Sequence, residues 1–190
     1  MRATRAIAMM LLTVLALASQ GCTERLIGEG MAAATGPKGA YYEEKPLAEQ
    51  KDHKALEAYK RFELGEVKNM TGKFMPPAFL TYLPAQFKEQ LAKSDLPKEP
   101  AGKTLVFQVS IIHYEAASTV DSVFGPFEEV VARVELVNKD DGKVIGQGVA
   151  VSRSDKSVNQ GAEKKAQGMA KALIKWASDY YPKPESSEKK

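Results

Sequence analysis

Apolar and polar positions alternate along the second half of the chain in a pattern that predicts three consecutive β-strands. The first is Thr104–Tyr114, which has apolar residues at every second position from Leu105 to Ile111. Glu129–Val137 has the same period, and Val144–Ser152 follows it after the turn signal Asp141-Gly142. We therefore expect an antiparallel meander in which each strand buries one face.

Two other stretches carry apolar residues three and four positions apart, which predicts helices. One runs from Met75 to Leu91 and contains Pro84, which should kink or restart it because proline cannot donate the interior hydrogen bond. The other runs from about Val158 to Tyr181. A short strand around Phe62–Val67, irregular at Gly65, precedes the first helix.

The resulting order is β-α-β-β-β-α, which predicts an α+β domain of two layers. We expect a small mixed sheet of about four strands, with both helices on one face. The first helix would serve as a crossover, which suits either a parallel pairing of the strands that it joins or a strand position between them, and the later strands would pair antiparallel. Glycines at 146 and 148 within the last strand predict a bulge or close packing against the backbone.

The amino terminus has the order of a secretory signal peptide. Arg2 and Arg5 precede the apolar run Ile7–Ala18, which is shorter than the ~20 residues that a membrane-spanning helix needs. We expect a lipoprotein signal peptide at 1–21 and a lipidated cysteine with a flexible tether at 22–57. The α+β globular domain would occupy 58–181, and a disordered polar tail would occupy 182–190.

Cys22 is the only cysteine of the chain, and it directly follows Ser19-Gln20-Gly21. This segment resembles the lipobox of bacterial lipoproteins, in which the cysteine is acylated and becomes the first residue after cleavage. The resemblance implies palmitate on Cys22 and firm membrane attachment, since several acyl chains hold a protein where one does not. Thr23 is not the aspartate associated with inner-membrane retention, so we expect the periplasmic face of the outer membrane.

The charge balance of the mature chain gives no reason to expect a nucleic-acid partner. The full sequence has 27 Lys and Arg against 24 Asp and Glu. Removal of 1–21 takes away Arg2 and Arg5, so 25 basic residues would face 24 acidic ones. A nearly neutral chain lacks the strong positive field that nucleic-acid binding requires.

Three parts of the chain carry a resemblance to known proteins. They are the strand Leu105–Ile111, the segment Val134–Val137 with the turn that follows it, and the final alanine-rich helix ending at Tyr180-Tyr181. Together they resemble small periplasmic domains related to the curli-secretion lipoprotein and, more distantly, to the amino-terminal domain of the Tol β-propeller protein. The resemblance implies envelope assembly, transport or surface-polymer work by binding, and it brings no catalytic residue with it.

Candidate chemistry is sparse. His53 lies in the expected tether and His113 at the end of the central strand, with no cysteine or carboxylate cluster at ligand spacing. We expect His113 to continue the apolar face of its strand as a partly buried histidine. The sequence therefore predicts no catalytic residue, no metal and no cofactor.

Candidate partner contacts lie on the last helix. Lys164, Lys165 and Lys171, together with Lys175, would place positive charge along its outer side, where lipopolysaccharide phosphates or peptidoglycan carboxylates could bind. Trp176 and Tyr180 are one turn apart and form either a contact patch or part of the core.

These observations favour a non-enzymatic, membrane-tethered periplasmic lipoprotein that binds a protein partner in an envelope assembly or export system. The alternative is a binding module for cell-wall glycan or lipid. A hydrolase is a third hypothesis, in which His113 would be the base.

Overall fold

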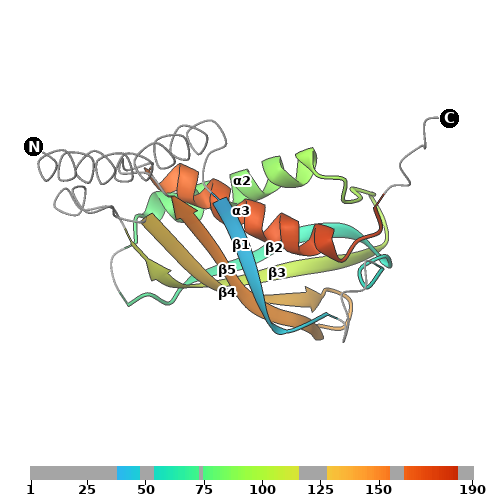
Figure 1. The fold of residues 1–190 in the computed structure, drawn as a ribbon. Helices are drawn as coiled ribbons and strands as arrows, with labels where there is room; N and C mark the ends of the chain where they lie inside the picture. The colour runs from blue at the N-terminus through green and yellow to red at the C-terminus, as the bar shows by residue number, and fades with distance from the viewer. Residues whose placement is uncertain (1–37, 48–53, 73–74, 116–127, 155–160, 184–190) are drawn as a thin grey trace, which may run out of the picture. The chain divides into compact units, whose positions relative to one another are not determined.

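The computed structural model describes residues 38–47, 54–72, 75–115, 128–154 and 161–183. They form five strands and two helices in the order β1, β2, α2, β3, β4, β5 and α3 (Figure 1). The bounds are Lys38–Lys45 for β1, Tyr59–Asn69 for β2, Pro77–Lys93 for α2, Lys103–Tyr114 for β3, Glu128–Asn138 for β4, Val144–Ser154 for β5 and Gly161–Asp179 for α3.

The strands form one mixed sheet in the order β1-β5-β4-β3-β2. β2 pairs with β3 in parallel through the α2 crossover, and every other pair is antiparallel. Both helices lie on the same side of the sheet (Figure 1). The predicted α+β class, the parallel first pairing and the meander are therefore confirmed.

The sheet has five strands where we expected about four, because β1 adds one at its edge. β1 lies inside the segment 22–57 that we expected to be a flexible tether, and it pairs with β5 from Lys38 to Lys45. Its sequence, KGAYYEEK, has no apolar alternation, so the period that revealed the other strands is missing. The expected tether also contains Leu56, which is fully buried.

The core lies between the sheet and the helices. Alternate residues of β4 are fully buried, as the period predicts, and these are Val130, Ala132, Val134 and Leu136. On α3 the fully buried residues recur at helical spacing and include Ala166, Met169, Ala170, Leu173 and Ala177. The large buried side chains are Leu56, Phe79, Leu83, Phe87, Leu105, Phe107, Ile111, Leu136, Met169, Leu173, Trp176 and Tyr180. Among the described residues, no helix covers the other face of the sheet, which we call the uncovered face (Figure 1).

The glycine predictions are confirmed. The register of β2 against β3 shifts between Leu64 and Val67, on either side of Gly65. A Cβ on Gly148 would lie 2.4 Å from the carbonyl oxygen of Tyr42 and 3.0 Å from the Trp176 ring, so β1 and α3 both approach that position.

Pro84 does not divide the helix that contains it, because α2 runs continuously from Pro77 to Lys93. Proline removes the hydrogen bond to the carbonyl of the residue four positions earlier, here Leu80. Leu80 is on the exposed side of α2, where water can solvate that carbonyl.

Several predictions fall outside the described residues. They concern the signal peptide, Cys22, His53 and the tail beyond Lys183.

Candidate functional site

Trp176 and Tyr180 do not form a surface patch. Their exposed fractions are 0% and 1%, so neither side chain is accessible to a partner in this structure. The expectation of a contact patch is corrected in favour of the core alternative. They are buried because β1, which the sequence pattern did not reveal, covers this side of α3.

The contacts between β1 and α3 are polar and aromatic. Both carboxylate oxygens of Glu43 accept hydrogen bonds, one from Trp176 Nε1 at 2.9 Å and the other from Tyr180 OH at 2.7 Å. Two residues earlier, the Tyr41 ring stacks on Trp176 with centroids 5.5 Å apart, and its hydroxyl donates to Asp179 Oδ2 at 2.7 Å. We call this set, Tyr41, Glu43, Trp176, Asp179 and Tyr180, the β1 latch.

The latch also changes the acidity of its two tyrosines. Burial raises the pKa of both Tyr41 and Tyr180 well above the usual value near 10. Hydrogen bonds to carboxylates add to the shift, from Tyr41 to Asp179 and from Tyr180 to Glu43, since a carboxylate acceptor favours the protonated phenol. Both hydroxyls are therefore held as donors.

Lys165 is not on the outer side of α3, as the sequence predicted. Its side chain is buried, with 2% exposure. The Lys165 ammonium donates to the carbonyl oxygen of Glu115 at 2.9 Å and lies 4.8 Å from the centre of the Tyr114 ring. Lys165 therefore ties α3 to the end of β3 and is removed from the candidate contacts.

Lys164 and Lys171 do lie on the outer part of the helix layer, and Lys93 at the end of α2 joins them. Lys164 is exposed and Lys171 is half-buried. The pKa of Lys171 is lowered, first by burial and then by the charges of Lys164 and Lys93. Glu89 bonds to Lys93 at 2.5 Å, and the pKa of Glu89 is lowered mainly by that bond.

His113 is exposed, which corrects the expectation that it is partly buried. A register shift between Ile111 and His113 turns the strand, so His113 leaves the apolar face on which Ile111 lies. Its Nε2 atom is 3.6 Å from a carboxylate oxygen of Glu115. Within the described ranges, no three His, Cys, Asp or Glu residues are grouped so as to hold a metal ion.

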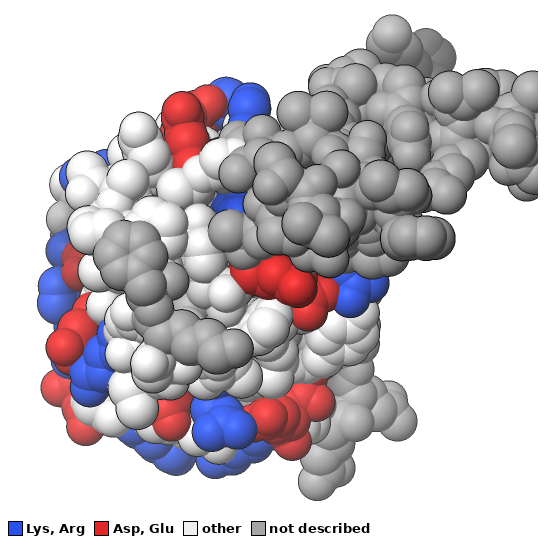
Figure 2. Space-filling view, turned by 90° about the vertical axis from the view of Figure 1, so that its left-hand side faces the viewer, with Lys and Arg blue, Asp and Glu red and all other residues white. Residues whose placement is uncertain are grey.

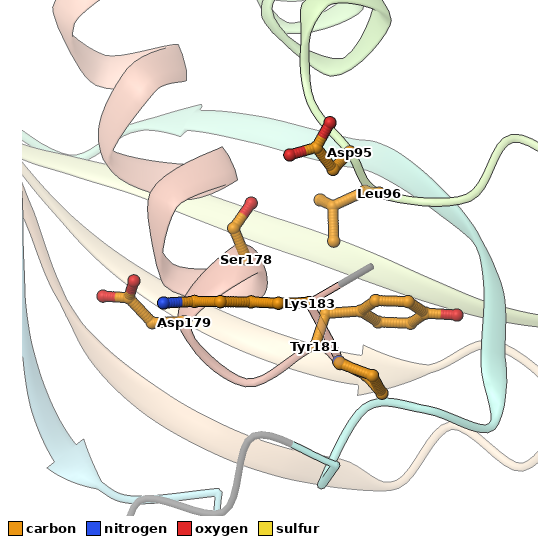
Figure 3. Close-up of a pocket in the computed structure, with 7 residues that line it drawn as sticks. Asp95, Leu96, Ser178, Asp179, Tyr181 and Lys183 are labelled. Atoms are coloured by element: carbon orange, nitrogen blue, oxygen red, sulfur yellow. The ribbon is translucent and has the colours of Figure 1, made fainter. Parts of the chain in front are cut away.

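A cavity of about 340 Å³ lies where α3 ends (Figure 3). Its walls come from the turn after α2 and from the end of α3, and they combine apolar and charged side chains. The lining residues are Asp95, Leu96, Ser178, Asp179, Tyr181, Pro182 and Lys183. The Lys183 side chain extends across the view with its amino end on the Asp179 side (Figure 3), so cationic and anionic groups are both present.

The uncovered face of the sheet carries a second hollow of about 340 Å³, which is mostly polar. It lies over β2, β3 and β4 and is lined by Glu66, Lys68, Gln108, Val109, Ser110, Arg133 and Glu135. Arg133 pairs in register with Ser110 on one side and with Val149 on the other, and Val149 pairs with Tyr42. Tyr42, with 64% exposure, therefore lies on the same face, two strands from Arg133.

Surface charge is mixed elsewhere. On the face drawn in Figure 2, acidic and basic side chains alternate along the border of the described residues, with uncharged side chains between them. None of the helices in the described part of the chain is both long and apolar enough to span a bilayer.

Comparisons with known proteins establish no family. No family model matches the chain, and no curated protein matches it. Among solved structures, a PelC variant dodecamer from Paraburkholderia phytofirmans is 14% identical with a TM-score of 0.46, covering 76% of this chain and 99% of that one.

Two further solved structures are similar to the chain. Protein XCC0632 from Xanthomonas campestris, of the DUF330 family, is 10% identical with a TM-score of 0.41, over 64% of this chain and 81% of that one. A "putative lipoprotein" from Caulobacter crescentus is 13% identical with a TM-score of 0.32, over 59% and 87%. Similarities of this size establish neither a family nor a function.

Sequence reasoning missed Tyr41 and Glu43, which bind the residues that it named as surface contacts. One signal was present, because positions 41 and 43 would share a face if the segment were a strand. The surrounding glycines and charges concealed it. Lys93 was missed because it lies on a different helix from the lysines that it joins.

Proposed function

We propose that this chain is a lipid-anchored, non-enzymatic protein of the bacterial periplasm that binds a protein partner in an envelope assembly or export system. The observation that carries the proposal is Cys22, which stands at the end of the chain's apolar leader in a segment resembling a lipobox. The first described strand begins at Lys38, with only 15 residues between it and the lipidated Cys22. A domain held so close to a membrane suits presentation to a partner.

The uncovered sheet face is the surface that we assign to the partner. Trp176 and Tyr180 are buried, whereas Tyr42 is 64% exposed and lies in register with Val149 and Arg133. Tyrosine and arginine are enriched at the centres of protein–protein interfaces, since these residues combine apolar area with hydrogen-bonding groups. Helices cover the opposite face, so partner binding here leaves the core undisturbed.

The alternative, a glycan-binding module, has one observation in its favour. The polar hollow over β2, β3 and β4 presents both donors, from Lys68 and Arg133, and acceptors, from Glu66 and Glu135. Sugar hydroxyl groups require both kinds of partner. Its contacts would be these residues, in place of the lysines and Trp176 that the sequence pointed to.

Two measurements on the intact chain test the proposal. Cys22→Ala should abolish palmitate labelling and release the protein to the soluble periplasm. Crosslinking of the lipidated wild type in cells, followed by mass spectrometry, should recover a stoichiometric protein partner. Tight membrane association of Cys22→Ala would contradict the anchor, and recovery of glycan alone would favour the alternative.

A further inference from the structure

The polar hollow on the uncovered face has its charged side chains sorted into two rows. It lies over β2, β3 and β4, and the strand pairing fixes which of its residues are neighbours across the sheet. Its volume, about 340 Å³, is within the range of pockets that hold small ligands. The order of the rows therefore indicates which charges such a ligand must carry.

One row is cationic. Lys68 on β2 pairs in register with Ser110 on β3, and Ser110 pairs with Arg133 on β4. A short side chain with a hydroxyl donor thus stands between two long cationic side chains that line the hollow with it. An anionic group placed over Ser110 would be within reach of all three side chains, because adjacent strands are only about 4.8 Å apart.

The next row along the strands is anionic. Gln108 on β3 pairs in register with Glu135 on β4, and the backbone N–H of Glu66 on β2 donates to Gln108 Oε1 at 3.1 Å. Two carboxylates therefore flank one amide. Glu135 also accepts a hydrogen bond from Gln147 Nε2 at 2.8 Å, which uses one of its two oxygens. Gln108 and Ser110 are two residues apart on β3, so the two rows are about 7 Å apart.

The ion pairs that these rows make within the protein are exposed. The Lys68 ammonium is 3.2 Å from a carboxylate oxygen of Glu66, and 56% and 65% of the two side chains are accessible. Arg133 Nε is 3.9 Å from a carboxylate oxygen of Glu44, and both of these side chains are also largely exposed. Exposed ion pairs add little to stability, so a ligand that meets both rows can replace them.

The spacing of the rows selects the length of the ligand. One extended residue spans about 3.5 Å, so the ammonium and the carboxylate of a single amino acid are too close together to reach both rows. Two residues span about 7 Å, which matches the separation of the rows. A neutral sugar can use the donors and acceptors of the hollow, but it has no charges to match the two rows.

We propose that the hollow binds a dipeptide whose two termini are free. Its carboxylate lies over Ser110, between Lys68 and Arg133. Its ammonium lies between the carboxylates of Glu66 and Glu135. Each terminus then makes charge-assisted hydrogen bonds, which are the stronger kind. The inference goes beyond the proposed function, since it concerns a small ligand and depends on neither the lipid anchor nor a protein partner.

Titration with glycylglycine tests the proposal on the mature chain from residue 22, which carries Cys22→Ala so that the lipid is absent. Heteronuclear NMR follows the amide signals of Ser110 and Arg133. We expect N-acetyl-glycylglycine and glycylglycinamide, which each lack one terminal charge, to bind about 10-fold more weakly. Glycine, in which the two charges are about half as far apart, should show a loss of the same size.

Two variants test the rows from the side of the protein. Arg133→Gln and Glu135→Gln each remove one charge from a row, and each should weaken the binding of glycylglycine about 10-fold. The matched controls are Arg153→Gln and Glu129→Gln, which break an ion pair between β5 and β4 outside the hollow. We expect the controls to change the affinity less than about twofold, and all four variants to keep the wild-type circular dichroism spectrum.

The blocked ligands need no substitution, so this part of the test does not depend on how a variant folds. Equal affinity for glycylglycine and its blocked forms, or no binding of any of them, would overturn the proposal. Losses in the control variants as large as those in the row variants would do the same. N-acetylglucosamine is the sugar probe, and if it binds at least as tightly as glycylglycine, the dipeptide is rejected in favour of the glycan alternative.

Discussion

The two edge strands of the sheet are held in different ways. β2 buries Tyr59 and Phe62 in the core and pairs with β3 along a parallel ladder. β1 has no fully buried residue, since its residues are half-buried or exposed, and the latch holds it to α3 through Tyr41 and Glu43. An edge strand with little apolar surface can thus be fixed by a few directed hydrogen bonds, which do not leave a periodic pattern in the sequence.

The two edge strands should differ most in how much stability the protein loses when a glycine in each is replaced by alanine. Gly39→Ala should destabilise the protein by about 3 kcal/mol, because its Cβ would meet α3 backbone atoms that cannot move aside. Gly65→Ala in β2 should cost about 1 kcal/mol, since its Cβ would meet the side chains of Val106 and Gln108, which can shift. Urea unfolding followed by the fluorescence of Trp176 measures both. A larger cost at Gly65 would show that β1 is not packed on α3.

A second comparison uses one carboxylate from each edge. Glu43→Ala leaves Trp176 Nε1 and Tyr180 OH without their acceptor, so we expect a loss of about 2 kcal/mol. Glu63→Ala in β2 removes ion pairs with Arg61 and Lys139 that are partly exposed, and it should cost less than about 1 kcal/mol. Unfolding monitored by circular dichroism avoids the tryptophan signal, which Glu43→Ala perturbs directly. Equal costs for the two variants would contradict the latch.

The latch also predicts a smaller effect, the pH dependence of stability. The pKa of Tyr41 and Tyr180 is raised in the folded protein, so above pH 10 the unfolded chain loses protons that the folded chain keeps. The contribution of these two tyrosines to stability should therefore be constant below pH 10 and fall as the pH rises beyond it, by up to about 1.4 kcal/mol per pH unit for each tyrosine.

Tyrosine variants isolate this contribution. In urea titrations between pH 8 and pH 11.5, the double variant Y41F/Y180F should have a lower stability at pH 8 and a flatter slope above pH 10. Tyr42→Phe, an exposed neighbour on the same strand, is the control and should keep the wild-type slope. An unchanged slope in the double variant would mean that other groups cause the alkaline loss.

Most of the fold could be predicted because burial is periodic in most of its elements. The alternation from Leu105 to Ile111 and the stripe from Ala166 to Ala177 follow directly from a sheet face and a helix face turned to one core. β1 could not be predicted this way, since its contacts with α3 depend on single residues, Tyr41 and Glu43, that meet distant positions.

The partner contacts on α3 could not be predicted correctly from the sequence for a related reason. The helical pattern placed Lys165 on the surface and left Trp176 open between a contact patch and the core. Contacts with the end of β3 bury Lys165, and contacts with β1 bury Trp176. Lys164 and Lys171 could be identified from helical spacing. Their association with Lys93 required the packing of α2 on α3, which a one-dimensional pattern does not contain.

The most direct test of the account is photocrosslinking in cells from two single positions of the intact lipidated protein, Tyr42 on the uncovered sheet face and Lys164 on the helix layer. Each residue is replaced in turn by a photoreactive amino acid, and the adducts are identified by mass spectrometry. We expect one recurrent protein partner from position 42 and none from position 164. A protein partner captured from position 164, with none captured from position 42, would contradict the assignment of the sheet face.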